Sequence, residues 1–197
     1  AVISANCTAA GGTYTVGGVV IAAAGDVITV YLDDEAEHGV TVTLTADGSS
    51  NLTGIDLYQN RLIVRHENAG PMTNAQLALF DSDGDLDIPF TSNSGLVLAD
   101  NTELYVWANK VFTPGGTVTT SPSSSSSSQD GDVHIKTNAI VNIGKKGLSV
   151  GGDFVNEADF SKSSGQTTTF TATSSGHLVT DNGTPWQHLT FSAASGG

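Results

Sequence analysis

The residues best suited to chemistry are four aspartates on alternate positions of the stretch DSDGDLD, namely Asp81, Asp83, Asp85 and Asp87. Ca²⁺ takes several oxygen ligands, and alternating carboxylates in a turn can converge on one such ion. The first three match the leading ligand positions of an EF-hand loop, and Asp87 is placed for the seventh. The pattern then fails, because Leu86 replaces the sharp-turn glycine and Ser92 replaces the bidentate glutamate. The stretch therefore predicts either a Ca²⁺ site or an acidic exposed loop, and Ca²⁺ is the one cofactor expected.

Catalysis has weaker support in the sequence. Paired acids cleave polysaccharides in some parallel β-helix folds, so a glycan-cleaving enzyme is one alternative. Such a site also needs basic residues to bind sugar acids, and these are scarce. A Ser-His-Asp triad cannot be assigned from sequence alone in so Ser-rich a chain. We expect no enzyme. The histidines lack metal-ligand spacing and are expected at the surface or in caps: His38, His66, His134, His177 and His188.

Composition narrows the class of protein. The 197 residues carry 20 acidic against 7 basic side chains, a formal charge of −13. This charge repels nucleic acid and anionic lipid, so neither is an expected partner. No apolar run approaches the roughly 20 residues of a membrane-spanning helix. The single cysteine, Cys7, excludes an internal disulfide. A chain starting at Ala1 fits an exported product after signal-peptide removal, or a trimmed chain.

Strand signals dominate the chain. Short runs rich in Val, Ile, Thr and aromatic residues, such as DVITVYL, GVTVTLTA and RLIVRHE, are separated by Gly, Asn, Asp and Ser. Turns recur about every eight to twelve residues, which is typical of β-sandwiches and β-solenoids. We therefore expect an all-β fold of short strands, either solenoid (β-helix-like) or sandwich. Very little helix is expected, at most a turn or two at 33–38 and 73–80.

The chain divides into four parts by amino-acid composition and the spacing of apolar residues. Six consecutive serines mark a loop or linker, and short apolar clusters closed by Gly, Asn or Ser follow it. The expected parts are an N-terminal β region at 1–68, a β region with the acidic loop at 69–120, the Ser-rich loop or linker at 121–132, and a β-solenoid-like repeat unit at 133–197.

The N-terminal stretch 1–25 is apolar, rich in small residues and almost uncharged. It predicts either a strand that inserts into a neighbouring subunit or the first strands of its own domain. Trp107 is expected in the core or at an interface, and Trp186 equally in the core or against another subunit. The expected subunit contacts are Trp186, Val19, Val20 and Ile21.

Three Asn-x-Ser/Thr triplets are candidate glycan acceptors if the chain is exported. They begin at Asn6, Asn51 and Asn182. Such triplets also arise by chance in a Thr-rich chain, so they alone do not predict glycosylation.

Residues 50–197 resemble large exported, repeat-bearing surface proteins of uncultured bacteria, which are adhesin-like and rich in Gly, Thr and Ser. The resemblance is carried by GIDLYQNRLIVRHENAGP and by the tail with GGDFVN and FTATSSGHLVTDNGTPWQHLTFSAASGG. It implies extracellular structural or adhesive work and supplies no catalytic motif. Members of that family usually carry many repeats, whereas this chain carries about one unit.

These observations predict a secreted, cell-surface structural subunit. Copies of it are expected to associate through strand pairing and stacking into an extracellular filament or surface assembly. One alternative is an adhesin or carbohydrate-binding module that binds surface glycans, and another is the glycan-cleaving enzyme. No nucleic-acid partner and no membrane span are expected.

Overall fold

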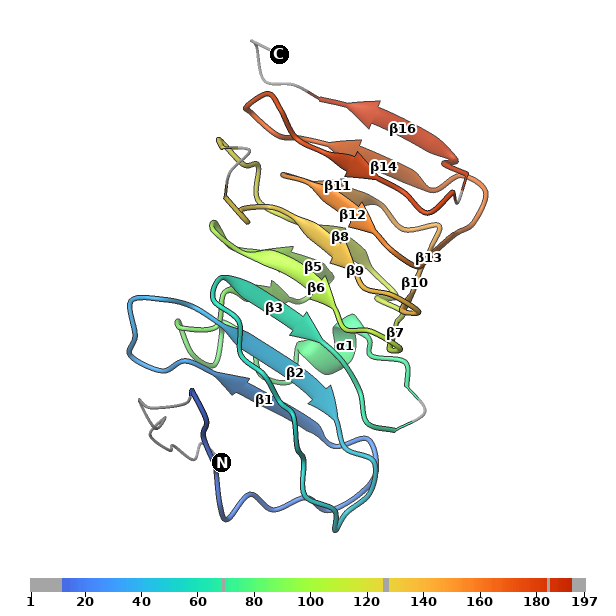
Figure 1. Ribbon diagram of the computed structural model, residues 1–197. Helices are drawn as coiled ribbons and strands as arrows, with labels where there is room; N and C mark the ends of the chain where they lie inside the picture. The colour runs from blue at the N-terminus through green and yellow to red at the C-terminus, as the bar shows by residue number, and fades with distance from the viewer. Residues whose placement is uncertain (1–11, 69, 126–127, 184, 193–197) are drawn as a thin grey trace.

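The computed structural model describes residues 12–68, 70–125, 128–183 and 185–192 (Figure 1). This part of the chain is nearly all β, with sixteen strands and one four-residue helix, which confirms the predicted class. Cys7 and Asn6 lie outside the described residues.

The largest sheet has seven strands, and all of its pairs are parallel except the first. In spatial order its strands are β1 (Val27–Tyr31), β2 (Val40–Leu44), β3 (Arg61–Val64), β6 (Glu103–Val106), β9 (Val133–Ile135), β12 (Phe154–Asn156) and β15 (Val179–Thr180). β1 and β2 form an antiparallel hairpin at the N-terminal end of the sheet.

Two further sheets accompany it. The six-stranded sheet comprises β16 (His188–Phe191), β14 (Thr167–Phe170), β11 (Leu148–Val150), β8 (Thr117–Thr119), β5 (Gly95–Leu98) and β4 (Phe90–Ser92). Only its terminal pair, β4 with β5, is antiparallel. The three-stranded sheet comprises β13 (Asp159–Lys162), β10 (Ile140–Gly144) and β7 (Val111–Phe112).

From β6 onwards the chain visits the three sheets in rotation. The first turn is β6, β7 and β8, the second is β9, β10 and β11, and the third is β12, β13 and β14. β15 and β16 then add one strand each to the two larger sheets. Figure 1 shows these turns lying side by side from the green to the red end of the chain. Equivalent residues are in register, so Leu104, Val133, Phe154 and Val179 form one row across four strands.

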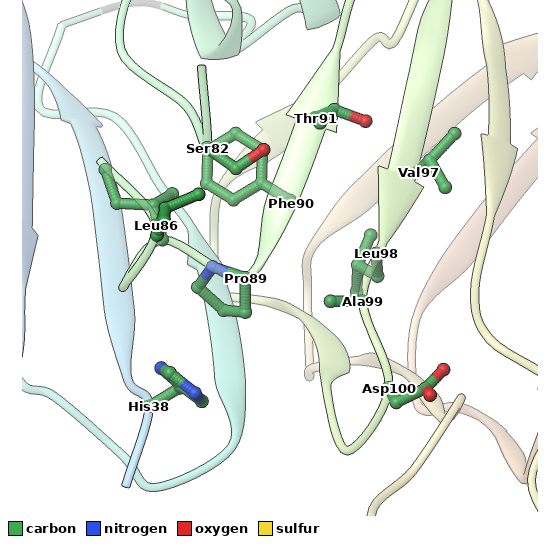
Figure 2. Close-up of a pocket in the computed structure, with 11 residues that line it drawn as sticks. His38, Ser82, Leu86, Pro89, Phe90, Thr91, Val97, Leu98, Ala99 and Asp100 are labelled. Atoms are coloured by element: carbon green, nitrogen blue, oxygen red, sulfur yellow. The ribbon is translucent and has the colours of Figure 1, made fainter. Parts of the chain in front are cut away.

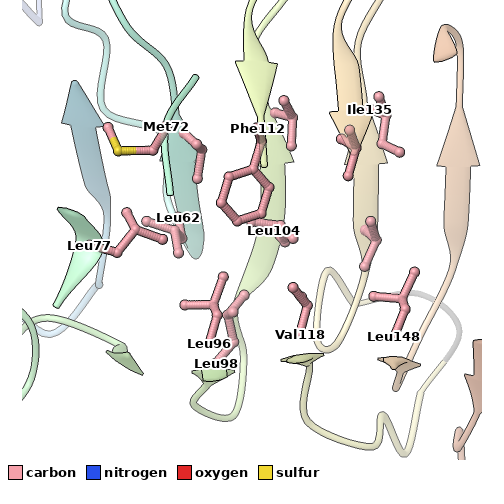
Figure 3. Close-up of a cluster of buried hydrophobic side chains, with 14 of the residues drawn as sticks. Leu62, Met72, Leu77, Leu96, Leu98, Leu104, Phe112, Val118, Ile135 and Leu148 are labelled. Atoms are coloured by element: carbon pink, nitrogen blue, oxygen red, sulfur yellow. The ribbon is translucent and has the colours of Figure 1, made fainter. Parts of the chain in front are cut away.

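The core lies between the sheets, and several strands, among them β9, β11 and β12, supply every second residue to it. In β9, Val133 and Ile135 are buried while His134 faces outward, as the period of two requires. Figure 3 shows Leu104, Phe112 and Val118, which come from three different sheets and belong to one hydrophobic cluster. Burying a side chain of this size stabilises the fold by about 1.5–3 kcal/mol.

The Ser-rich segment is a loop between β8 and β9, and residues near its start are packed into the fold. Ser123 is fully buried. Its N–H donates to the Gly151 carbonyl at 2.8 Å, and its carbonyl accepts from the Thr173 N–H at 2.9 Å. Gly151 is needed here, because a Cβ at this position would lie 1.6 Å from the Ser121 carbonyl oxygen. The strands before and after the loop share one hydrophobic cluster.

The helix α1 (Asn74–Leu77) begins at Thr73 with a capping box. The Thr73 hydroxyl accepts from the Gln76 N–H, and the Gln76 side chain accepts from the Thr73 N–H. This confirms a short helix within 73–80. The other predicted turn, 33–38, contains bends and no helix. The described part of the chain holds no helix that is both apolar and long enough to span a bilayer.

Residues 12–25 form no strand, apart from one bridge residue at Thr13. The Tyr14 hydroxyl donates to the Ile55 carbonyl, and the Asp26 carboxylate accepts from the Ala22 and Ala23 N–H groups at 2.7 and 3.0 Å. The described part of the N-terminal stretch is therefore an irregular segment beside the hairpin of β1 and β2.

Candidate functional sites

The acidic stretch is divided between two roles. Asp81 is 4% exposed, and its two carboxylate oxygens accept from the Asp83 N–H at 3.1 Å and the Ser92 N–H at 2.8 Å. It closes a turn, and Ser92, the residue at the expected glutamate position, is its backbone partner. Asp83 is exposed. These two residues therefore do not join the carboxylate group formed by the second half of the stretch.

That group consists of Asp33, Asp85 and Asp87, each of which offers a carboxylate oxygen within 4.8 Å of the others. Asp85 accepts from the Tyr31 hydroxyl at 2.9 Å, and Asp87 accepts from the Asp34 N–H at 2.7 Å. Burial and the Asp85 carboxylate raise the pKa of Tyr31 to about 12. Burial and the neighbouring aspartates also raise the pKa of Asp33. An oxygen-only donor set of this kind suits a hard cation such as Ca²⁺.

A shallow groove adjoins the acidic loop. Figure 2 shows Leu86 and Pro89 on one side of it and Leu98 and Ala99 on the other. Leu86 is 89% exposed, so the residue that breaks the EF-hand pattern projects into solvent beside the groove. The His38 ring nitrogen Nδ1 lies 3.2 Å from the Asp87 carbonyl oxygen, which links the groove to the acidic group.

The C-terminal end presents apolar side chains on or next to two strands, β15 and β16, that are paired on one side only within the described residues. We call this surface the C-terminal face. It consists of four exposed side chains: Leu178, Val179, Leu189 and Phe191. Phe191 is 68% exposed although its ring stacks on Phe170, with centroids 5.4 Å apart. An exposed apolar edge is the feature that strand proteins normally avoid unless it has a partner.

Trp186 lies beneath this face and packs against the core. Its ring is 5.2, 5.9 and 6.1 Å from the rings of Phe154, Phe160 and Phe170. The Lys162 ammonium lies 4.5 Å from the centroid of the indole ring. Trp186 is half-buried, so core packing accounts for most of its surface. The large apolar side chains left exposed at this end are those of the C-terminal face.

Two of the predicted N-terminal contact residues are also exposed. Val19 is 40% and Val20 88% exposed, whereas Ile21 is half-buried. All three lie in the irregular segment 12–25. Apolar residues of strand-forming type are thus presented to solvent outside any sheet.

A charged network covers the outward side of the seven-stranded sheet. Arg61 pairs with Glu103, and the His134 ring lies 3.4 Å from Glu103 and 2.8 Å from Glu157. Lys136 reaches Glu157 at 2.6 Å. Burial opposes protonation of His134, but the hydrogen bonds that the ring donates to the Glu103 and Glu157 carboxylates outweigh it and raise the pKa of the ring. Lys136 and His134 lower the pKa of Glu157 to about 2.

Three aromatic rings border this network. Tyr105 lies 6.1 Å from Tyr58 and 5.8 Å from Trp107, and the Arg61 guanidinium lies between the two tyrosines, 5.3 and 5.2 Å from their centroids. Trp107 therefore belongs to this outer cluster rather than to the interior. Sequence reasoning missed the cluster, because Tyr58 precedes β3 and is 47 residues before Tyr105 on β6.

Two of the three candidate glycan acceptors lie within the described residues, and both are at the surface. Asn51 and Asn182 are exposed, as a glycan acceptor must be. Asn182 also donates to the Ala158 carbonyl at 3.1 Å. His66, expected at the surface or in a cap, is buried, and its Nε2 accepts from the Val111 N–H at 2.8 Å.

Comparison with known proteins gives no assignment. No protein-family model, no curated protein and no solved structure matches this chain. The fold and the side-chain geometry are therefore the basis for any statement about function.

Proposed function

We propose that the chain is a short β-solenoid that serves as a structural subunit of an extracellular filament or surface assembly, with no chemistry of its own. The parallel pairing of successive turns from β2 to β16 supports a solenoid over a sandwich, because sandwiches are built from antiparallel strands. The observation that carries the proposal is the C-terminal face. The sequence resemblance to exported surface proteins is consistent with it.

The proposed partner of this face is a second copy of the chain. In a stacked fold each turn covers the apolar edge of the previous one, so β15 and β16 offer backbone groups and side chains to a further layer. The segment 12–25 has strand-forming residues and no sheet of its own, and Val20 is almost fully exposed. Inserted beside β15 or β16 of another copy, it would gain backbone hydrogen bonds and bury its valines.

The test is assembly of the chain as a function of concentration, by light scattering and negative-stain microscopy. We expect fibres or large oligomers from the wild type and a loss of both in Phe191→Asp or after removal of residues 1–25. Leu79→Asp is the matched control, because Leu79 is 69% exposed but lies next to α1. A wild-type chain that stays monomeric at high concentration would overturn the proposal. An equal loss of assembly in Phe191→Asp and Leu79→Asp would also overturn it.

Ca²⁺ is the ion we propose for Asp33, Asp85 and Asp87, where it would hold the acidic loop against the end of β1. Thermal melting with Ca²⁺ and with chelator tests this role. We expect Ca²⁺ to raise the midpoint of the wild type but not that of Asp85→Asn. Asp83→Asn, which removes an exposed carboxylate outside the group, should keep the response. An unchanged wild-type midpoint would leave only a solvated acidic turn.

A carbohydrate-binding role is the second candidate, and the aromatic cluster of Tyr58, Tyr105 and Trp107 is the observation that favours it. Half-exposed rings bordered by charged groups can stack on sugar rings and hydrogen-bond their hydroxyls. Retention on a glycan array that Trp107→Ala abolishes would support this role. The absence of any retention would exclude it for the glycans displayed.

A further inference from the structure

Three metal-ligating side chains meet where three successive turns enter the seven-stranded sheet. Asp132 comes directly before β9, Asp153 directly before β12, and His177 two residues before β15. The register that pairs Val133 with Phe154 places Asp132 beside Asp153. Each of the three offers a ligand atom within 4.8 Å of the others, and all three are partly buried.

We propose that Asp132, Asp153 and His177 form a binding site for a divalent transition-metal cation of the zinc class, which joins three turns of the chain. Zinc accepts imidazole nitrogen and carboxylate oxygen ligands, which this group supplies, whereas the oxygen-only group of Asp33, Asp85 and Asp87 suits Ca²⁺. Zinc bonds of about 2.0–2.2 Å place tetrahedral ligands roughly 3.3–3.5 Å apart.

The hydrogen bonds around His177 already have the arrangement that a metal ligand needs. Its Nδ1 lies 2.9 Å from an Asp153 oxygen, and its Nε2 lies 2.9 Å from the Ser174 hydroxyl. A cation bound between Nδ1 and Asp153 takes the place of the proton shared by these atoms. The ring proton then resides on Nε2 and is donated to Ser174, which fixes the ring orientation as outer partners of metal-bound histidines do.

Electrostatics at the site also favour a cation. The Asp132 and Asp153 carboxylates lie within 4.8 Å of each other where the turns enter the sheet. The side chain of His177 is only 10% exposed, so solvent screens charges next to its ring poorly. Gly152 leaves room for the Asp132 carboxylate, since a Cβ there would lie 2.2 Å from its Oδ1. A divalent ion would neutralise two closely placed carboxylates that otherwise repel each other.

Ser174, His177 and Asp153 are hydrogen-bonded in the order of a hydrolase's Ser-His-Asp triad. The test must therefore distinguish metal binding from hydrolysis. Isothermal titration of the full chain with Zn²⁺, after chelation and desalting, should show one site that competes with a chromogenic zinc chelator. His177→Ala should lose this binding. Asp132→Asn, whose amide oxygen still accepts from the Asp153 N–H, should weaken it at least about tenfold. His188→Ala, which removes an exposed histidine on β16, should bind like the wild type.

Thermal melting supplies a second readout. At about 100 times the dissociation constant, Zn²⁺ should raise the wild-type midpoint by roughly 5–10 °C and leave that of Asp132→Asn nearly unchanged. Equal zinc binding by wild type and His177→Ala, or no stoichiometric zinc binding by the wild type, would overturn the proposal. So would labelling of Ser174 by a fluorophosphonate that Zn²⁺ does not block. None of these outcomes depends on whether copies of the chain assemble.

Discussion

Replacing Asp132 by asparagine should stabilise the metal-free protein at neutral pH. Asp132 sits beside Asp153, and the Asp153 N–H donates to its Oδ1 at 2.6 Å. The amide oxygen of asparagine keeps this hydrogen bond and removes the charge. Because burial and the Asp153 carboxylate disfavour the ionised form of Asp132, the folded protein loses stability when the group ionises.

The size of the effect follows from the pKa. Burial raises the pKa of Asp132 from the reference value of 3.8 to about 6. Each unit corresponds to 1.36 kcal/mol, so ionisation would cost at most about 3 kcal/mol above pH 6. Solvent still reaches part of the carboxylate, and allowing for screening leaves about 1–2 kcal/mol. The cost develops between pH 4 and pH 6 and is absent below pH 4, where the group is protonated in both states.

Urea unfolding in the presence of chelator, followed by tryptophan fluorescence, measures the difference. We expect Asp132→Asn to exceed the wild type by about 1–2 kcal/mol at pH 7.5 and to match it near pH 3.5. Asp56→Asn removes one negative charge at an exposed position and controls for net charge. A gain of the same size at both pH values would refute the electrostatic reasoning, and so would an equal gain in the control.

Two further variants test packing and a buried imidazole. Gly151→Ala should lower the unfolding midpoint strongly, or prevent folding, because the added Cβ would overlap the Ser121 carbonyl. Gly147→Ala is the control and should change the midpoint little, since the nearest neighbour of its Cβ lies at 3.9 Å. Similar midpoints for the two variants would contradict this packing. His66→Phe should cost about 1–3 kcal/mol at pH 8, because the Val111 N–H loses its acceptor. Burial lowers the pKa of His66, so the wild type loses stability as the pH falls below about 6.5. The difference in unfolding free energy between wild type and His66→Phe should therefore narrow there. A constant difference from pH 8 to pH 5 would show that His66 is not a buried neutral imidazole.

The fold class could be predicted from the sequence, because strand composition and turn residues are local signals. DVITVYL and RLIVRHE both contain strands, β1 and β3. The parallel rotation through three sheets is set by long-range register, which no single stretch records. For this reason the sequence shows a repeat pattern of short apolar clusters only after residue 133, whereas the structure shows the same rotation from β6.

The candidate sites were predicted only in part, and the reason is again register. Spacing within DSDGDLD suggested that its four carboxylates act together, yet Asp81 is used to close a turn and Asp33 completes the acidic group from 52 residues before Asp85. Asp132, Asp153 and His177 carry no motif in sequence, because each belongs to a different turn. Their meeting depends on the pairing of β9, β12 and β15.

The lengths of the turns bear on how such a chain can change over evolution. From Leu104 to Val133 the chain runs 29 positions, and from Val133 to Phe154 it runs 21, yet both pairs are in register. The additional residues belong to the Ser-rich loop between β8 and β9, outside the sheets. Insertions and deletions in homologous chains should therefore collect at this corner. Within a strand a single added residue would exchange inward and outward faces, so selection should hold the strand lengths fixed.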